Sequence, residues 1–318
     1  MQSAIRAVAS APGMMLRVGT RGSALALAQA GEVRQRLATI HGFPSERVEL
    51  RVIRTTGDKV RDRPLAEAGG KGLFTKEIEE ALIAGEIDIA VHSAKDMPTI
   101  IPPGLVIGAV PPREDARDVF ISRKAARLLD LPRCACVGTA SLRRQALVKR
   151  FRPDLAVVSF RGNVETRLQK LEAGAADATL LALAGLKRLG LAEKATMILS
   201  VDEFLPAVGQ GIIAVEARAN DARVLALLAP LNDAVSASAL AAERSFLAEL
   251  DGSCRTPIAG HATIYAGRLE FRGLIARPDG SQCFEVERNG AAADADRLGK
   301  DAGRELKRRA GSDFFATG

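Results

Sequence analysis

The stretch ALIAGEIDIAVHS, residues 81–93, decides the fold class of this chain. A helical run ends at Ala-Gly, a pair typical of a helix C-terminus, and two residues later Asp88 leads into an apolar run that predicts a buried strand. The stretch KLEAGAADATLLA, residues 170–182, has the same order of helix, Ala-Gly, two residues, Asp and strand. Glycine after a helix is common, so the repeat by itself does not establish a duplication. It does favour two similar α/β lobes.

Strand and helix patterns alternate around both stretches. In the first half we expect strands at 16–20, 48–53 and 87–93 and helices at about 23–40 and 75–84. In the second we expect strands at 118–122, around 134–139, at 155–160 and at 177–182, and helices that begin at Ser141 and Asn163. Such alternation is typical of layered α/β domains with a largely parallel sheet.

Two segments rich in Pro, Gly and charge mark crossings between the lobes. They are PPREDARD (111–118) and DEFLPAVGQG (202–211), and the run at 212–218 is expected to return as a strand to the first lobe. A helix at 234–250, three strands and a closing helix at about 292–310 follow. A chain of 318 residues is long enough for two or three domains. We expect a disordered extension at 1–15, a first domain at 16–111 plus 211–230, a second at 116–205 and a third at 231–318.

The composition excludes several classes of protein. Aromatic residues make up 4% of the chain and Trp is absent, which leaves little material for the base-stacking surfaces of nucleic-acid-binding proteins. Four scattered cysteines, Cys134, Cys136, Cys254 and Cys283, do not make a disulfide framework and point to a reducing compartment, the cytoplasm. No second Cys or His pair lies near the first two to complete a zinc site. No run approaches the roughly 18 apolar residues of a membrane span.

Positive charge is concentrated in the middle of the chain. Between residues 116 and 205 there are 16 Lys or Arg and 9 Asp or Glu, an excess of seven that equals the net charge of the whole chain. Clustered positive charge favours an anionic partner, although a basic solvated face has the same composition.

Four short stretches place arginine beside small or hydroxyl residues at expected loop-to-helix junctions. They are VGTRGSALA (18–26), GTASLRRQA (138–146), FRGNVETRL (160–168) and AGLKRLG (184–190). Free backbone N–H groups at a helix N-terminus favour an anion, and the guanidinium fork matches carboxylate or phosphate. Any one of them is also explained as a surface arginine beside a helix cap. Together they predict an anion-rich ligand in a cleft between the lobes.

Two further segments are candidates for the site. In AVHSAKDMP (90–98), Lys95 and Asp96 follow the expected strand, and ligands in α/β sheets bind beyond the carboxyl ends of strands. Asp96 is thus placed like a catalytic carboxylate, with a helix N-cap as the alternative. The glycine-rich GGKGLFTKEI (69–78) is not a phosphate-binding P-loop, and we interpret residues 55–72 as a mobile lid, with an ordinary flexible loop as the alternative.

The loop LDGSCRTPIAG (250–260) carries Cys254 next to an arginine. A buried structural thiol normally lies among apolar neighbours, and this one does not, so it is either a reactive thiol or a spare one. A Ser/His/Asp mechanism is disfavoured because the chain has three histidines and no G-x-S-x-G motif.

Eight segments in order resemble the hydroxymethylbilane synthase family, also called porphobilinogen deaminases. They are RVGTRGSALALAQ, GGKGLFTKE, AVHSAKDMPT, GTASLRRQA, RGNVETRL, AGLKRLG, PAVGQG and GSCRTPIAG, and they extend from about Leu16 onward. The resemblance implies two periplasmic-binding-protein-like lobes of the class II type around a cleft, plus a third small α+β domain. It also implies a monomer.

The resemblance implies a transferase of tetrapyrrole and heme biosynthesis. Four porphobilinogen molecules are joined in steps, each with loss of ammonia, to a dipyrromethane linked to Cys254 by a thioether, and linear hydroxymethylbilane is released by hydrolysis. Asp96 is then the catalytic residue. The residues that bind the cofactor would be Cys254, Lys95, Ser141, Arg143, Arg144, Ser23 and Arg188. Those that bind the carboxylates of the substrate would be Arg21, Arg161, Arg167 and Lys71.

A non-enzymatic two-lobed module that binds anions, such as a sensor, is the alternative. It explains the arginines and the cleft but assigns no role to Cys254 or Asp96. Residues 139–141 vary from the family pattern in small side chains, and the first 15 residues match nothing in it. We expect no metal ion, no nucleic acid and no membrane as partners.

Overall fold

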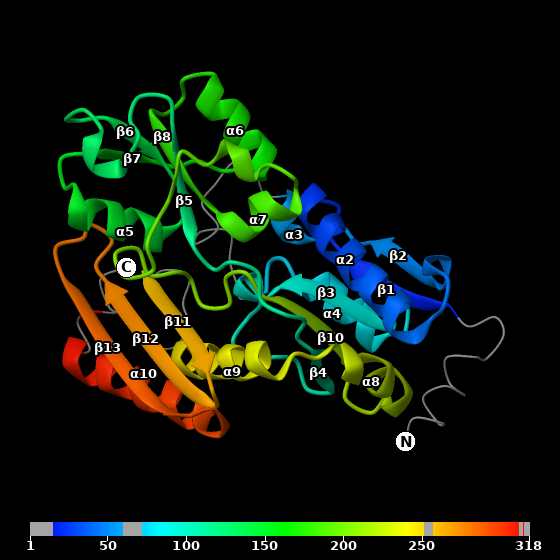
Figure 1. Cartoon of the computed structure of the whole chain (residues 1–318). Helices are drawn as coiled ribbons and strands as arrows, with labels where there is room; N and C mark the ends of the chain where they lie inside the picture. The colour runs from blue at the N-terminus through cyan, green and yellow to red at the C-terminus, as the bar shows by residue number, and fades with distance from the viewer. Residues whose placement is uncertain (1–14, 60–71, 251–256, 312–313, 315–318) are drawn as a thin grey trace. The chain divides into compact units, whose positions relative to one another are not determined.

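A computed structural model describes residues 15–59, 72–250, 257–311 and 314. The chain divides into two compact units (Figure 1). The first comprises residues 1–60, 69–113 and 212–237, and the second comprises residues 61–68, 114–211 and 238–318. The first unit therefore contains two segments that lie about a hundred residues apart in the sequence.

A five-stranded sheet forms the centre of the first unit. Its strands are β1 (Leu16–Thr20), β2 (Val48–Val52), β3 (Ile89–Ser93), β4 (Leu105–Ala109) and β10 (Ile213–Arg218). Their order is β2-β1-β3-β10-β4, with β1 parallel to β2 and β3, and with β10 antiparallel to β3 and β4. The predicted return of residues 212–218 to the first lobe is confirmed. The sequence analysis did not identify β4.

Helices cover both faces of this sheet. They are α2 (Ala24–His41), α3 (Thr56–Lys59), α4 (Lys76–Ile83) and α8 (Ala222–Leu228), with 3-10 turns η1 (Ser45–Arg47), η2 (Ala94–Asp96) and η5 (Ala229–Leu231). Side chains alternate along a strand, so Ile89 and Val91 of β3 join the core under α2, whereas Ala90 joins the core under α4.

A second five-stranded sheet lies in the second unit. Its strands are β5 (Asp118–Ser122), β6 (Cys136–Gly138), β7 (Ala156–Val158), β8 (Ala178–Ala182) and β9 (Met197–Ile198). The neighbouring helices are α5 (Leu142–Phe151), α6 (Val164–Glu172) and α7 (Leu183–Arg188), with 3-10 turns η3 (Leu128–Asp130) and η4 (Ala192–Lys194). The order β7-β6-β8-β5-β9, with β5 antiparallel to both neighbours, repeats the topology of the first sheet.

The repeated sequence motif occupies the same place in both sheets. The Asp88 carboxylate accepts from the backbone N–H of Arg17 at 2.8 Å, and the Asp88 N–H donates to the Arg17 carbonyl at 2.8 Å. Asp177 does the same with Cys136, at 2.7 and 2.8 Å. In each case the aspartate links the start of the central strand of its sheet, β3 or β8, to the neighbouring strand, β1 or β6. The prediction of two similar α/β lobes is thus confirmed at the level of topology.

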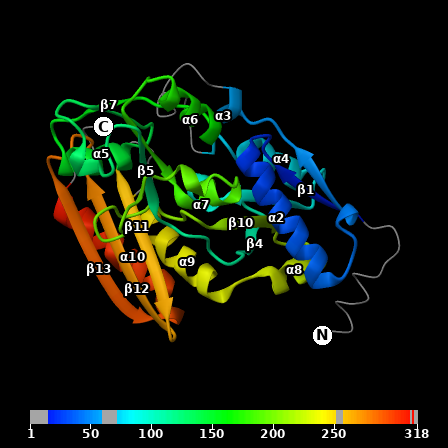
Figure 2. The ribbon, with the colours of Figure 1, turned by 45° about the horizontal axis from the view of Figure 1, so that its top comes forward.

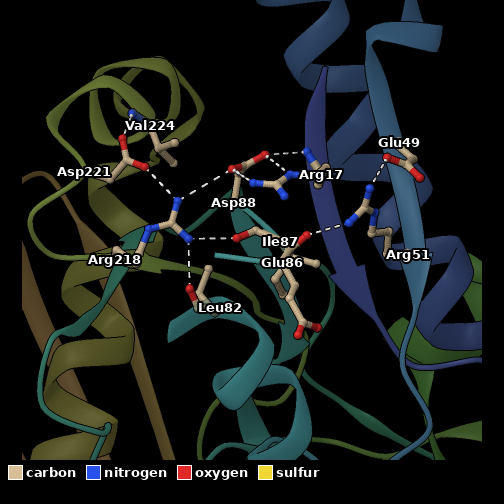
Figure 3. A network of polar contacts seen from close by, with 10 residues as sticks. All are labelled: Arg17, Glu49, Arg51, Leu82, Glu86, Ile87, Asp88, Arg218, Asp221 and Val224. Carbon is tan, nitrogen blue, oxygen red and sulfur yellow. Dashed lines mark hydrogen bonds and ion pairs between the residues drawn. The ribbon is translucent and has the colours of Figure 1, made fainter. Parts of the chain in front are cut away.

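In the first unit, Asp88 is also the centre of a polar network (Figure 3). The Arg17 side chain donates to both carboxylate oxygens of Asp88, at 3.0 and 2.7 Å. Arg218 of β10 donates to the carbonyls of Leu82 and Ile87 and to Asp221, each at 2.8 Å. Burial opposes ionisation of Asp88, but the hydrogen bonds from Arg17 keep its pKa lowered. The network joins β1, β10, the end of α4 and the start of α8.

The second unit also contains a three-stranded antiparallel sheet (Figure 2). Its strands are β11 (Ile258–Tyr265), β12 (Arg268–Ala276) and β13 (Cys283–Ala291), and its helices are α9 (Ala234–Glu249) and α10 (Ala295–Ala310), the latter preceded by the 3-10 turn η6 (Ala292–Asp294). Phe246 and Phe271 pack together in the core of this part, with ring centroids 4.9 Å apart. Leu274 and Ala276 of β12 belong instead to the core of the second five-stranded sheet.

Two features are absent from residues 15–59, 72–250, 257–311 and 314. No group of three or more His, Cys, Asp or Glu side chains is arranged to hold a metal ion in that part of the chain. No single helix there is long and apolar enough to cross a membrane, and only residues 222–231 and 234–249 taken together, with a bend of 107° between them, have the required length and composition.

Candidate active site

Asp96 lies just beyond the carboxyl end of β3, as predicted. The chain leaves β3 at Ser93, where the Ala94 N–H donates to the Ile212 carbonyl at 3.0 Å, and turns through η2. At Met97 the backbone is already extended, so no helix starts at this point. The alternative interpretation of Asp96 as a helix N-cap is therefore wrong. The side chains of Lys95 and Asp96 are both exposed.

A pocket in the first unit has Asp96 in its wall. The other polar or aromatic side chains that line it include Arg21, Ser23, Gln29, Phe74 and His92. They come from the turn between β1 and α2, from α2 itself, from the residues before α4 and from β3. The pocket thus brings a guanidinium group and a carboxylate to one place, from segments about 75 residues apart in the sequence.

Arg21 is held in the wall of this pocket by two side chains that the sequence analysis did not identify. Its guanidinium group lies over the ring of Phe74, 4.1 Å from the centroid, and pairs with Asp58 of α3 at 2.5 Å. Burial alone would raise the pKa of Asp58, but hydrogen bonds from Arg21 and Thr55 keep it lowered. Asp58 therefore remains ionised and orients Arg21.

Ser23 has the expected place at the N-terminus of α2. Its hydroxyl accepts from the Ala26 N–H at 3.3 Å. One turn later Gln29 exchanges hydrogen bonds with Ser93, at 2.8 and 3.1 Å. This contact ties α2 to the end of β3, close to Asp96.

In the second unit, Ser141 likewise caps α5 by accepting from the Arg144 N–H at 3.4 Å. Arg143 and Arg144, which were expected to face a ligand, are buried, with 5% of each residue exposed. Both pair with the fully buried Asp118, each at 2.7 Å. Arg144 also donates to the Leu180 carbonyl at 2.8 Å. Their predicted contact with the cofactor stays a prediction, but their pairing with Asp118 gives both arginines a structural role.

Asp118 is the residue that sequence reasoning missed in this unit. Its burial would raise its pKa, but the two guanidinium groups lower it to about 2. Gln210 adds a hydrogen bond to the same carboxylate at 3.0 Å. The sequence did contain an indication of this role, because Asp118 stands at the start of the apolar strand β5. A charged side chain at such a place needs a buried partner of opposite charge.

The other predicted arginines of the second unit lie on α6, on α7 and in the loop before α6. Arg167 of α6 donates through Nε to the Gly162 carbonyl at 2.9 Å, and Arg188 of α7 donates to the Gly211 carbonyl at 3.2 Å. The Arg161 carbonyl accepts from Lys170 at 3.0 Å. All three arginines are partly exposed. Cys254, Lys71 and most of the lid predicted at 55–72 lie outside the described residues.

The comparison with known families is decisive. The profile of the porphobilinogen deaminase dipyrromethane cofactor-binding domain matches residues 16–226, and that of the porphobilinogen deaminase C-terminal domain matches residues 237–308. The chain belongs to the porphobilinogen deaminase family. The resemblance stated from eight motifs is confirmed, and so are the predicted class of enzyme, a transferase, and the predicted dipyrromethane cofactor.

Curated relatives cover nearly the whole chain. The porphobilinogen deaminase of Nitrobacter hamburgensis is 62% identical over 95% of this chain and 96% of its own length. That of Paracoccus denitrificans is 58% identical over 94% and 96%. Because these relatives are enzymes by name, the comparison favours an enzyme over the non-enzymatic anion-binding module.

The chain also resembles solved structures, at much lower identity. A periplasmic substrate-binding protein of an ABC transporter from Coxiella burnetii has a TM-score of 0.43 and 16% identity, and covers 70% of this chain and 94% of its own. A methionine-binding protein has a TM-score of 0.44 and 13% identity, and covers 68% of this chain and 89% of its own.

Proposed function

We propose that this enzyme is a hydroxymethylbilane synthase, which joins four porphobilinogen molecules with loss of ammonia and releases linear hydroxymethylbilane. Asp96 is its catalytic residue, and Cys254 carries the dipyrromethane through a thioether. The observation that supports the proposal best is the pocket of the first unit, where Asp96 and Arg21 line one wall. A carboxylate for a developing cation and a guanidinium group for a substrate carboxylate are the two groups that this reaction needs.

The charge in the second unit suits the cofactor. When bound, the dipyrromethane supplies the pyrrole ring to which the first substrate is joined, and it brings several carboxylates. Two buried guanidinium groups face one buried carboxylate at Asp118, which leaves an excess of one positive charge. The Nε atom of Arg143 is buried and has no hydrogen-bond partner among the described residues. An anionic group is the natural complement of such a cluster.

Asp96 would act on the substrate that loses ammonia. Departure of the amine leaves an electron-poor pyrrole cation, and a nearby carboxylate lowers the barrier by interacting with the pyrrole N–H and the developing charge. Asp96 is exposed at the pocket, so it can reach a bound ring without rearrangement of the core. Arg21 would hold a carboxylate of that ring while Asp58 fixes the direction of the guanidinium plane.

The anchor is tested by the intact mass of the purified enzyme. We expect the mass to exceed that of the chain by two pyrrole rings, and we expect Cys254→Ser to lack this addition and to be inactive. A Cys283→Ser variant is the matched control, because Cys283 lies half-buried on β13, and it should keep both the added mass and the activity. Unmodified wild-type enzyme with full activity would refute the role of Cys254.

The role of Asp96 is tested separately. We expect Asp96→Ala to lose turnover by about a hundredfold or more while its thermal unfolding is unchanged, because an exposed side chain contributes little to stability. Asp130→Ala, at a surface aspartate that pairs with Arg127, is the control and should remain active. Near-normal turnover of Asp96→Ala would remove this residue from the mechanism.

The remaining proposals concern organisation. We propose a first domain at residues 16–111 with 211–230, a second at 116–205 and a third at 231–318 that carries Cys254. The disordered extension expected at 1–15 lies, apart from Met15, outside the described residues. Arg161, Arg167, Arg188, Lys71 and Lys95 would bind carboxylates. We also propose a cytoplasmic monomer without nucleic-acid or membrane partners. The low number of cysteines supports the cytoplasm, and the low number of aromatic residues supports the absence of nucleic acid. Size-exclusion chromatography with light scattering tests the monomer.

A further inference from the structure

Three titratable side chains are buried together on the face of the first sheet that α4 covers. They are Glu79 of α4, His92 of β3 and Glu216 of β10, with 6%, 5% and 0% of the residue exposed. The rest of this layer is apolar and consists largely of Ile78, Leu82, Ile87, Ala90 and Leu105. Burial of two carboxyl groups and an imidazole in an apolar layer costs free energy.

The strand register places His92 and Glu216 on one face. His92 pairs with Ala214, and Glu216 pairs with Ala90, so the two side chains are diagonal neighbours on adjacent antiparallel strands. The Nε2 atom of His92 lies 3.2 Å from an Oε atom of Glu216. Nε2 of His92, both Oε atoms of Glu216 and Oε1 of Glu79 have no hydrogen-bond partner among the described residues, so His92 and Glu216 approach each other without forming a hydrogen bond.

The two carboxyl groups cannot easily be ionised at the same time. Burial raises the pKa of Glu79, and the negative charge of Glu216 raises it further, while His92 acts in the opposite direction. Glu80, the exposed neighbour on α4, adds a weaker repulsion. The raised pKa of Glu79 favours its protonated form in this layer.

The cluster reaches the pocket of the candidate active site. The His92 side chain lines the same pocket as Asp96, which lies four residues further along the chain, and Arg21 lines it as well. Between them, backbone hydrogen bonds hold the end of β3 to β10, and η2 begins directly after. A change in the packing of His92 is therefore transmitted over one short, rigid connection to Asp96.

We propose that Glu79, His92 and Glu216 form a positioning cluster, which holds the end of β3, and with it Asp96, in place at the pocket. This inference rests on the proposed catalytic role of Asp96. The cluster does not act by adding stability, since an apolar set of the same volume would be equally or more stable. Its contribution is a fixed direction of the His92 ring in the wall of the pocket.

The test uses the cofactor-loaded enzyme and three glutamine variants of the same shape. Glu216→Gln removes the charge that faces His92, and we expect kcat to fall by about tenfold or more with KM changed by less than about twofold, because a displaced catalytic group costs rate and not substrate affinity. Glu216→Asp should recover part of the loss. Glu80→Gln is the matched control on α4, where the side chain is exposed, and should behave as wild type.

Glu79→Gln mimics the protonated carboxyl group. We expect this variant to keep its kcat to higher pH than wild type, because it cannot lose the proton that the cluster retains. A merely structural role of Glu79 would change unfolding but not the pH profile of kcat. This variant also keeps the proposal testable if Glu216→Gln does not fold.

Two results overturn the proposal. One is a Glu216→Gln enzyme with the kcat of Glu80→Gln, and the other is a Glu79→Gln enzyme with the pH profile of wild type. Asp96→Ala is measured alongside. If Asp96→Ala is inactive while Glu216→Gln is fully active, the positioning cluster is refuted and the proposed function stands. If Asp96→Ala is itself active, the catalytic role of Asp96 is refuted instead.

Discussion

Replacement of Asp118 by asparagine is the sharpest test of how the second unit is held together. The carboxylate is fully buried and faces two buried guanidinium groups, Arg143 and Arg144, at 2.7 Å each. A carboxyl group whose pKa falls from 3.8 to about 2 is stabilised by about 2 kcal/mol in its ionised form. Asparagine loses this interaction and also leaves the two guanidinium groups without a counter-charge. We therefore expect the free energy of unfolding to fall by about 3–5 kcal/mol in Asp118→Asn.

Circular dichroism is the suitable probe, because the chain has no Trp and one Tyr. We expect the midpoint of thermal unfolding to fall on the order of 10 °C in Asp118→Asn. Asp130→Asn, which breaks an exposed pair with Arg127, is the control and should leave the midpoint unchanged.

The pH dependence gives a second measure of the same interaction. Because the pKa of Asp118 is lowered in the folded state, its stabilising effect is complete above the unfolded value of 3.8 and is lost as the pH falls towards 2. The difference in stability between wild type and Asp118→Asn should therefore be constant near neutral pH and shrink below about pH 4. Equal midpoints for the two proteins at pH 7 would refute the reasoning.

Three further predictions concern stability and are measured by the same thermal unfolding. Asp88→Asn should cost about 1–3 kcal/mol at neutral pH, because Arg17 then loses its charged partner, and an unchanged midpoint would contradict the network. Gly280→Ala should lower the midpoint of thermal unfolding more than Gly267→Ala, although both glycines have positive φ. A Cβ at Gly280 would lie 2.5 Å from the backbone nitrogen of Arg150, whereas a Cβ at Gly267 would have none of the described atoms within 4 Å. Equal effects of the two substitutions would contradict the close contact at Gly280. Glu79→Gln should gain stability relative to wild type as the pH rises above 4.5, the ordinary pKa of a glutamate, because the raised pKa of Glu79 makes the wild type lose stability as this group ionises in the folded state. A constant difference in stability would speak against this.

The sequence by itself predicted most of the strands and helices of the two lobes, but not β4, β9 or α8. Ser23 and Ser141 predict where α2 and α5 begin, because their hydroxyl groups cap the N-termini of these helices. The alternation of strands and helices, and the repeated Ala-Gly followed by Asp, predicted the two similar lobes. These features depend on residues that lie within about one helical turn of each other along the chain, so they can be predicted from the sequence alone. The class of reaction was predicted from the family motifs, because helix caps and strand patterns carry no information about chemistry.

Only the tertiary structure decided which charged side chains face a ligand and which face each other. The sequence marks Arg143, Arg144 and Arg21 alike as anion-binding residues, but the first two are buried against Asp118 and the third stacks on Phe74 beside Asp58. Glu79, His92 and Glu216 come from three elements, and nothing near any of them in the sequence indicates the other two. The energy of a charge depends on burial and on partners distant in the chain, and both are set only when the strands and helices pack.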